Sequence, residues 1–196
     1  MKRPNIVPIL LAAGSSDQLG FPKPLARFGH RTALEIAMKN CAGLARPIVV
    51  LGSNADAIQK SMLRGARVVI NRRWKRGQLS SLLAGLRRVP RGAAFLIYPV
   101  DHPLVTREIV EQIAHAFEER PKGKAIIMPK FRRYHGHPVI CAAEIRGELK
   151  RARTAREVIY RDMRRVQFVY VATSVICRDF SDPASYLACL QRFPLR

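Results

Sequence analysis

Short apolar runs alternate with helix-like segments along this 196-residue chain, and this alternation restricts the folds open to it. Apolar runs of a few residues bounded by turn residues are typical of buried strands. We expect strands at Asn5–Leu11, Pro47–Leu51, Ala66–Ile70, Ala93–Pro99, Lys124–Met128, Pro138–Cys141 and Gln167–Ala172. Strands that alternate with helices form mostly parallel sheets covered on both faces. The pattern therefore predicts an α/β fold in a single domain, residues 1–196, with ligands outside the carboxyl ends of the strands.

The intervening segments have the periodicity and the start signals of helices. We expect helices at Ala33–Cys41, Ala55–Leu63, Ser80–Val89, Arg107–Glu119, Ala155–Asp162 and Pro183–Gln191. The spacing of Thr32 and Glu35, and of Thr154 and Glu157, matches a capping box. Asp182 precedes a first-turn proline and is expected to cap the last helix. Three helix starts therefore follow from local hydrogen bonding.

Composition favours a compact domain in a reducing compartment. Hydrophobic residues make up 48% of the chain, and no apolar run approaches the roughly 20 residues that span a bilayer. The four cysteines, Cys41, Cys141, Cys177 and Cys189, are scattered and form no C-x-x-C pair. This spacing indicates buried free thiols and neither a zinc site nor a disulfide framework. We therefore expect a cytoplasmic protein that does not bind membranes.

The formal net charge of +21 is the unusual feature of the composition. Basic residues are dense at Arg72–Arg91, Arg120–Arg133 and Arg146–Arg165. Such a surface attracts polyanions whatever the function, so nucleic-acid or polyanion binding is an alternative. However, zinc-finger spacing and RNP-like strands are absent from the sequence, and aromatic residues are only 7%. Anionic ligands and a basic surface account better for the charge than specific nucleic-acid binding.

A glycine- and serine-rich turn follows the first expected strand. Gly14 and Gly20 enclose Ser15 and Ser16, and Lys23 comes shortly after. Successive backbone N–H groups in such a turn can surround phosphate oxygens, and a lysine adds a point charge. The alternative is an ordinary strand-to-helix loop with a solvated lysine. The turn is thus a candidate phosphate site.

Two later segments place polar residues at strand ends on the same side of the predicted sheet. Ser80 and Ser81 lie near a helix start, where backbone N–H groups are free, although a capped helix with Trp74 packed over it is the simpler interpretation. Asp101 ends an apolar strand, and a carboxylate there can hold Mg²⁺. The alternative is a turn aspartate that stabilises the next helix. We interpret the adjacent His102 as loop polarity.

Four segments in order resemble the motifs of the MobA-like nucleotidyltransferases. Residues 10–25 are similar to L-A-A-G-x-S-x-R-M-G-x-P-K-x-L, and residues 71–85 to N-x-x-W-x-x-G-M-x-S-S-L-x-x-G. Residues 99–104 resemble P-x-D-x-P-L, and residues 134–140 resemble G-x-x-G-H-P-V-L. The Ala-Ala-Gly form is most similar to that of molybdenum-cofactor cytidylyltransferases. The resemblance implies a three-layer, Rossmann-like nucleotide-diphospho-sugar transferase fold with a mostly parallel central sheet.

The resemblance also implies the reaction and the residues that serve it. The chain would be an enzyme that moves CMP, or another NMP, from an NTP (CTP favoured) to a phosphorylated acceptor, suggested to be molybdopterin, with Mg²⁺ and release of pyrophosphate. A molybdoenzyme or a chaperone is an implied protein partner. Lys23 and Asp101 are the implied catalytic residues, with Asp101 as metal ligand. Acceptor binding is assigned to Gly136, His137 and Pro138; the alternative for His137 is a hydrogen-bonding core histidine at the start of a strand. Nucleotide binding is assigned to Leu11, Ala12, Ala13, Gly14, Ser15, Ser16, Gln18, Gly20, Lys23, Asn71, Ser80 and Ser81.

Two positions depart from the family motifs. Gln18 stands where the family has arginine, and Ser181 falls on the family's second metal-binding aspartate. A hydroxyl can enter a Mg²⁺ shell but brings no charge, so Ser181 is a weak metal ligand. Each departure removes one charge from the triphosphate–metal site. They motivate a competing hypothesis, a non-catalytic nucleotide- or cofactor-binding protein of the same fold.

Overall fold

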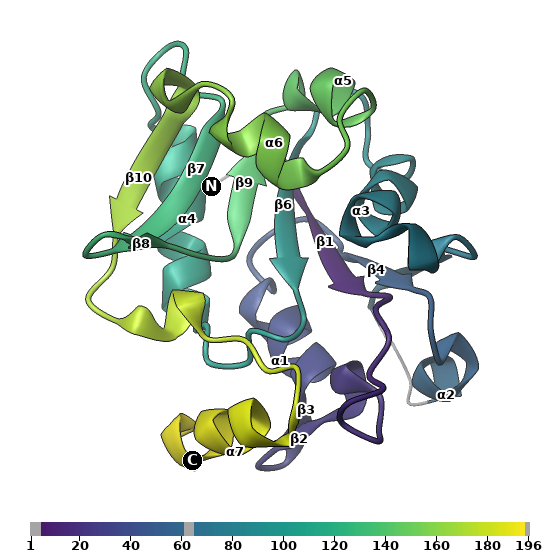
Figure 1. Cartoon of the computed structure of the whole chain (residues 1–196). Coiled ribbons are helices and arrows are strands. Elements are labelled where there is room, and N and C mark those ends of the chain that lie inside the picture. Colours follow the sequence, from purple (N-terminus) through teal and green to yellow (C-terminus); the bar gives the residue numbers. More distant parts are fainter. Residues whose placement is uncertain (1–4, 61–64, 195–196) are drawn as a thin grey trace.

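The computed structural model describes residues 5–60 and 65–194, and these residues form an α/β domain around one mixed sheet (Figure 1). The order of the strands is β10-β7-β9-β6-β1-β4-β5, with β8 paired to β7. All neighbours are parallel except where β9 pairs with β6 and β7 and where β8 pairs with β7. The strands are β1 (Ile6–Ala12), β4 (Ile48–Leu51), β5 (Arg67–Ile70), β6 (Ala94–Pro99), β7 (Ile126–Phe131), β8 (Tyr134–His135), β9 (Val139–Cys141) and β10 (Val166–Tyr170).

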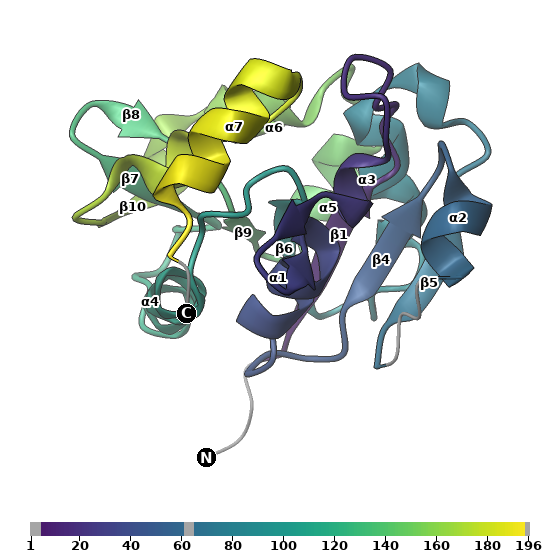
Figure 2. The same ribbon diagram turned by 90° about the horizontal axis from the view of Figure 1, so that it is seen from below.

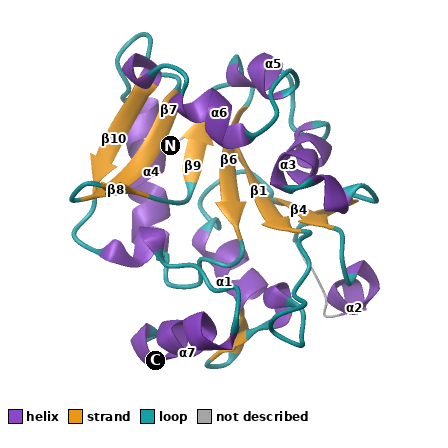
Figure 3. Ribbon diagram, viewed as in Figure 1, coloured by secondary structure: helices purple, strands orange, loops and turns teal. Residues whose placement is uncertain are grey.

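Helices cover both faces of the sheet, which gives three layers (Figures 2 and 3). One face carries α1 (Ala33–Asn40) and α4 (Arg107–Glu118), and the other carries α3 (Gln78–Leu86), α5 (Ile145–Leu149) and α6 (Ala155–Tyr160). The short α2 (Ala55–Lys60) connects β4 to β5, and α7 (Pro183–Arg192) lies beyond the carboxyl ends of the central strands. None of the helices in the described residues is long and apolar enough to cross a membrane.

The sheet and its coverage confirm the predicted fold class, and the seven expected strands are present with shifted ends. The capping box of Thr32 with Glu35 is confirmed, and Asp182 caps α7 in a reciprocal pair with Ser185. Thr154 also accepts from the Glu157 N–H, but the Glu157 carboxylate accepts from Arg153 instead of Thr154. The last residues of the helix expected at 55–63 lie outside the described residues.

Several elements differ from the sequence-based expectation. The sequence did not predict the hairpin of β2 (Arg27–Phe28) and β3 (Arg31–Thr32), the short β8, or α5. The helix expected to start at Ser80 begins at Gln78 and is preceded by a 3₁₀ turn, Trp74–Arg76. These are elements of two to five residues or end shifts, for which periodicity carries little signal.

A second hydrophobic cluster joins the early and late parts of the chain. Phe28 lies at its centre, with ring centroids 5.5 Å from Phe180, 5.3 Å from Tyr186 and 5.4 Å from Phe193. The Tyr186 hydroxyl donates to the Arg27 carbonyl oxygen at 2.7 Å. The cluster therefore holds α7 against the hairpin that follows the glycine-rich turn. Its buried members are Leu19, Ala26, Phe28, Ala33, Ile36, Leu104, Phe180 and Cys189.

Candidate active site

A cleft of about 310 Å³ opens where the carboxyl ends of β1 and β6 meet the start of α3. Parallel pairing places these strand ends side by side, because β1 is hydrogen-bonded to both β4 and β6. The position agrees with the expectation that ligands bind outside the carboxyl ends of parallel strands. Predicted site residues that line the cleft are Leu11, Ala12, Ala13, Gly14, Ser15, Lys23, Ser81 and Asp101.

Asp101 is held in the wall of the cleft by backbone hydrogen bonds on both sides of it. The Val100 N–H donates to the Leu11 carbonyl oxygen at 3.2 Å, and the Phe180 N–H donates to the Asp101 carbonyl oxygen at 3.1 Å. The carboxylate is about one quarter exposed, at 26%, and its Oδ2 lies 4.0 Å from the Lys23 Nζ. The structure thus brings together the two residues that the resemblance assigns to catalysis.

His102 contacts the same carboxylate, and interpreting it as mere loop polarity was wrong. Its Nδ1 lies 2.9 Å from the Asp101 Oδ1, and the residue is 9% exposed. Burial by itself would raise the pKa of Asp101, but the hydrogen bond from His102 and the charges of His102 and Lys23 outweigh it and lower that pKa. Asp101 is therefore ionised at neutral pH, and His102 donates to it through Nδ1.

Ser181, the second suggested metal ligand, is engaged in hydrogen bonds at the start of α7. Its Oγ donates to the Asp182 Oδ2 at 3.1 Å, and its N–H donates to the Ser185 Oγ at 3.0 Å. Across residues 5–60 and 65–194, no group of three His, Cys, Asp or Glu side chains could hold a metal ion. Asp101 alone still suits Mg²⁺, because this ion is commonly held by one or two carboxylates and the phosphates of the substrate.

Part of the glycine-rich turn shapes the backbone and does not line the cleft. The Ser16 Oγ accepts from the Lys23 N–H at 2.8 Å, and its carbonyl oxygen accepts from the Leu19 N–H at 2.9 Å. Gly20 has a φ of +73°, which L-residues with a Cβ rarely adopt. Ser16, Gly20 and the exposed Gln18 therefore lie outside the cleft lining, although all three are predicted nucleotide-binding residues.

The predicted contacts on the second motif are divided between two sides of α3. The Asn71 Nδ2 donates to the Ser80 Oγ at 2.9 Å and to the Ser81 Oγ at 3.1 Å. The Ser80 hydroxyl in turn reaches the Gly77 carbonyl oxygen at 2.8 Å. Ser81 faces the cleft, whereas Asn71 and Ser80 line a separate groove. The Asn71 side chain thus fixes the turn before α3.

Gly52, which follows β4, is a site residue that sequence reasoning missed. A Cβ added there would lie 2.6 Å from the Ala13 carbonyl oxygen and 2.6 Å from the Trp74 Cβ. The Ser53 N–H donates to the same Ala13 carbonyl oxygen at 3.0 Å. Ala13 and Trp74 both line the cleft, so its width depends on the absence of a side chain at position 52. A glycine directly after an apolar strand was the available signal.

We expect Gly52→Ala to weaken nucleotide binding and to destabilise the fold by about 1–3 kcal/mol, because the new methyl group overpacks the wall of the cleft. Thermal unfolding and calorimetric titration with CTP measure the two effects. Gly92→Ala is the matched control, since a Cβ at Gly92 meets nothing within 4 Å. Equal behaviour of the two variants would show that the contact between Gly52, Ala13 and Trp74 does not set the cleft's shape.

A second cavity of about 260 Å³ adjoins the cleft, and Gln78 lines both. It contains His135, Gly136 and His137 of the fourth motif together with Arg156 and Tyr160 of α6. A Cβ at Gly136 would overlap the Ile176 carbonyl oxygen, so only glycine fits. Pro138 follows a cis peptide bond and does not line the cavity, in contrast to the other predicted acceptor residues.

His137 lines this second cavity and has a buried ring nitrogen without a partner among the described residues. Burial, together with the nearby His102, lowers the pKa of His137 to about 4, so its ring is neutral at physiological pH. The ring hydrogen-bonds to the Ile97 backbone, while its buried Nδ1 has no hydrogen-bond partner. A neutral imidazole that donates through one nitrogen accepts through the other. His137 Nδ1 is thus a buried acceptor that no described residue satisfies.

Comparison with known proteins agrees with this geometry. The profile of the MobA-like NTP transferase domain matches residues 8–168. A nicotine blue oxidoreductase of Paenarthrobacter nicotinovorans is 30% identical over 151 residues, which are 73% of this chain and 74% of that protein.

Among solved structures, Rv0371c of Mycobacterium tuberculosis superposes with a TM-score of 0.85 at 27% identity, covering 97% of this chain and 100% of that one. The same protein has been solved with manganese, at a TM-score of 0.80 and 25% identity over 95% of this chain and 98% of that one. A molybdopterin-guanine dinucleotide biosynthesis protein A of Archaeoglobus fulgidus shares the fold, with a TM-score of 0.73 at 16% identity over 95% and 98% of the two chains. The chain belongs to the MobA-like NTP transferase family and is a transferase enzyme with a Rossmann-like nucleotidyltransferase fold.

Proposed function

We propose that this enzyme transfers CMP from CTP to a phosphorylated acceptor in the cytoplasm and releases pyrophosphate. The observation that carries the proposal is the pair of opposite charges in the cleft, with the Lys23 Nζ 4.0 Å from the Asp101 Oδ2. The preference for CTP rests on Ala13 and the Ala-Ala-Gly motif. The reducing compartment is supported by Cys41, Cys141, Cys177 and Cys189, all of which are free thiols.

In the proposed reaction, a phosphate oxygen of the acceptor attacks the α-phosphorus of CTP in line. A new phosphorus–oxygen bond forms, and the bond from the α-phosphorus to the bridging oxygen of pyrophosphate breaks with its electron pair. The ammonium of Lys23 offsets the charge that develops on the phosphate oxygens. Asp101 would hold Mg²⁺, which supplies Lewis-acid charge on the phosphates when bound. His102 keeps the Asp101 carboxylate oriented and ionised.

The second cavity is the proposed acceptor site because it opens next to the cleft at Gln78. Its wall contains His135, whose ring stacks on Phe168 with centroids 4.7 Å apart, and Tyr160, over which the Arg156 guanidinium lies at 5.1 Å. Flat aromatic surfaces and a cation suit a planar heterocycle that carries a phosphate. These features support molybdopterin as the acceptor.

Calorimetric titration with CTP and GTP in the presence of Mg²⁺ tests the base preference. We expect CTP to bind more tightly, because Ala13 lies in the cleft wall at a position where the family's cytidylyl members have alanine and its guanylyl members have glycine. Equal or reversed affinities would contradict the cytidylyl assignment. The titration also separates this proposal from general polyanion binding, which shows a steep salt dependence and no base preference.

A pyrophosphate-release assay with CTP and molybdopterin tests the reaction itself. Release that requires both substrates and a divalent ion supports the proposal. Because one relative is named as an oxidoreductase, the assay includes NADH and NADPH with a reducible dye in parallel. Consumption of reduced nicotinamide without pyrophosphate release would contradict nucleotidyl transfer and indicate a redox enzyme.

Replacing Arg156 with glutamine is expected to raise the KM for the acceptor by about fivefold and to leave the KM for CTP unchanged. The exposed guanidinium is expected to contribute about 1 kcal/mol through its charge on the acceptor phosphate. Steady-state kinetics with each substrate varied in turn measures this split. Arg153→Gln, an equal charge loss on the same segment outside the cavity lining, is the control. A rise in the KM for CTP instead would indicate that the nucleotide, and not the acceptor, binds in the second cavity.

A further inference from the structure

An arginine-lined groove of about 700 Å³ lies beside α3 and is separated from the cleft by residues 71–77. We name it the arginine groove. Its floor is apolar and comes from β5 and α3, and its rim carries five guanidinium groups. None of the described residues that line it is acidic. Besides Asn71 and Ser80, its lining residues are Val69, Ile70, Leu83, Ala84, Arg72, Arg73, Arg76, Arg87 and Arg88.

The guanidinium groups of the groove have no partners among the described residues. None of the five arginine side chains forms an ion pair or a hydrogen bond with another described residue. Other arginines of the chain do use the protein's own carboxylates: Arg165 and Arg161 both pair with Glu148. A guanidinium stays charged at physiological pH and binds carboxylates through two parallel hydrogen bonds. The groove is therefore a concentrated, uncompensated site for anionic groups.

The groove adjoins the outer edge of β5, to which no strand of the described residues is paired. β5 is the terminal strand of the sheet and pairs with β4 alone in the described part of the chain (Figure 2). The N–H groups of Arg67 and Asn71 point inward, to Pro47 and Leu51 carbonyl oxygens at 2.8 and 2.7 Å. Because N–H groups alternate along a strand, those of residues 68 and 70 point outward.

The side chains on this edge are also available for contact. Val68 is 38% exposed and Ile70 is 48% exposed, although both belong to the sheet. An exposed strand edge of this kind pairs readily with another extended chain. The groove thus adjoins cations and outward backbone donors that have no partner among the described residues, and one exposed apolar residue of the edge, Ile70, lines it.

We propose that an extended acidic segment of a partner protein docks here, adding a strand to the edge of β5 and placing its carboxylates against the arginines. Strand addition supplies backbone hydrogen bonds, and alternate side chains reach the groove. A nucleic acid fits less well, because none of the described residues that line the groove is aromatic and could stack on a base. Trp74, the nearest candidate, lines the cleft instead.

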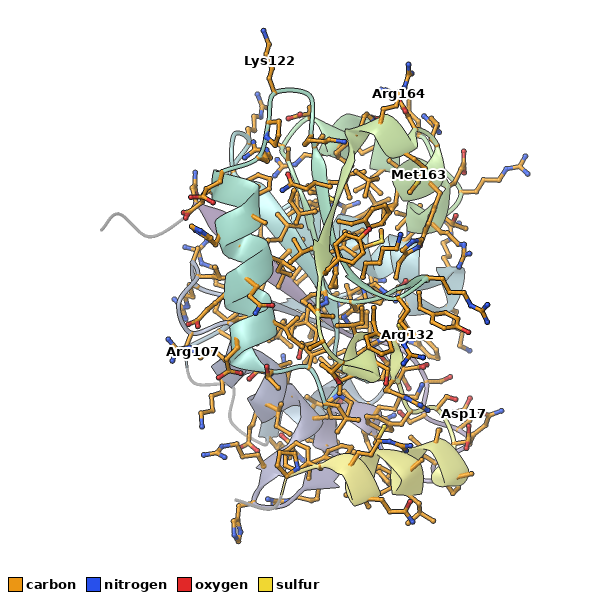
Figure 4. The ribbon with its side chains drawn as sticks, turned by 90° about the vertical axis from the view of Figure 1, so that its left-hand side faces the viewer. Asp17, Arg107, Lys122, Arg132, Met163 and Arg164 are labelled. Carbon is orange, nitrogen blue, oxygen red and sulfur yellow. The ribbon has the colours of Figure 1, made fainter. Side chains whose placement is uncertain are left out.

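Fluorescence anisotropy with a labelled peptide of alternating glutamate and valine, at physiological salt, tests the charge contribution. We expect the triple variant Arg73→Gln/Arg76→Gln/Arg87→Gln to bind about tenfold more weakly than the wild type. The control variant, Lys39→Gln/Lys122→Gln/Lys150→Gln, loses the same charge elsewhere; Lys122 projects away from the body of the protein (Figure 4). An equal loss in both variants would overturn the proposal, since binding would then follow net charge alone.

Two further measurements test the occupant. Ile70→Pro removes an outward N–H without touching the pairing to β4, so it should weaken peptide binding more than Ile70→Ala does. Equal effects of these two variants would overturn strand addition. Single-stranded DNA is titrated in parallel. If DNA binds more tightly than the peptide and the arginine triple variant abolishes this binding, the groove is a nucleic-acid site and the proposal is overturned. Unchanged CTP affinity in every variant verifies an intact fold.

Discussion

Asp101→Asn is expected to lower pyrophosphate release by about a thousandfold, which corresponds to roughly 4 kcal/mol of transition-state stabilisation. The amide keeps the size of the carboxylate and can still accept from His102, but it removes the negative charge that would hold Mg²⁺. We also expect nucleotide binding to lose its dependence on Mg²⁺. Initial rates and CTP titrations with and without Mg²⁺ measure both effects.

Thermal unfolding of the same variant separates a metal ligand from a turn residue. The pKa of Asp101 is lowered in the folded protein, so its ionised form adds stability above the ordinary aspartate pKa, and this is lost as the pH falls through the lowered value. With Lys23 at 4.0 Å and partial exposure, we expect the melting temperature at neutral pH to change little. A large drop in melting temperature with unchanged Mg²⁺ dependence would place the metal elsewhere.

Restoring the family residues, with Gln18→Arg and Ser181→Asp, is expected to raise pyrophosphate release by at least about tenfold. Each new charged contact is worth about 1.5–3 kcal/mol and acts on charge that develops in the transition state. From the structure, we expect the two substitutions to contribute unequally to this gain in activity. Gln18 is exposed and has no side-chain hydrogen bond among the described residues, whereas Ser181 already hydrogen-bonds Asp182 at the start of α7.

The single variants resolve this inequality. We expect Gln18→Arg to provide most of the gain, since a second carboxylate beside Asp182 costs electrostatic energy before any metal binds. Pyrophosphate assays on both single variants and the double variant measure the contributions. A fast wild-type enzyme that either substitution slows would show that the site is adapted to its present residues and to a different substrate.

The parallel sheet and most of its helices could be predicted because each long element carries its own periodic signal. β1 and β6 are continuous apolar runs that are buried on both faces, as expected for central parallel strands. The hairpin of β2 and β3 could not be predicted, since its strands have two residues each and their stability comes from packing under α7. The length of an element, more than its composition, determined whether it could be predicted from the sequence.

The candidate site was only partly predictable, because motif order does not show which way a side chain points. Ser80 and Ser81 are adjacent in sequence and face different cavities, since successive residues lie about 100° apart around a helix. His102 had no signal apart from its position next to Asp101, and its contact depends on how the turn after β6 is held by Phe180. Gly52 required knowledge of which loops approach each other across the sheet.

The second hydrophobic cluster has a consequence for the time at which the cleft takes its final form during synthesis. Phe28 lies just after the glycine-rich turn, but its ring packs on Phe180, Tyr186 and Phe193, which follow β10 in the sequence. A growing chain can complete every strand of the sheet while the turn behind Lys23 still lacks its support. The family match ends at residue 168, so a protein shortened at that boundary would retain the matched motifs and lose the helix that holds this turn in place.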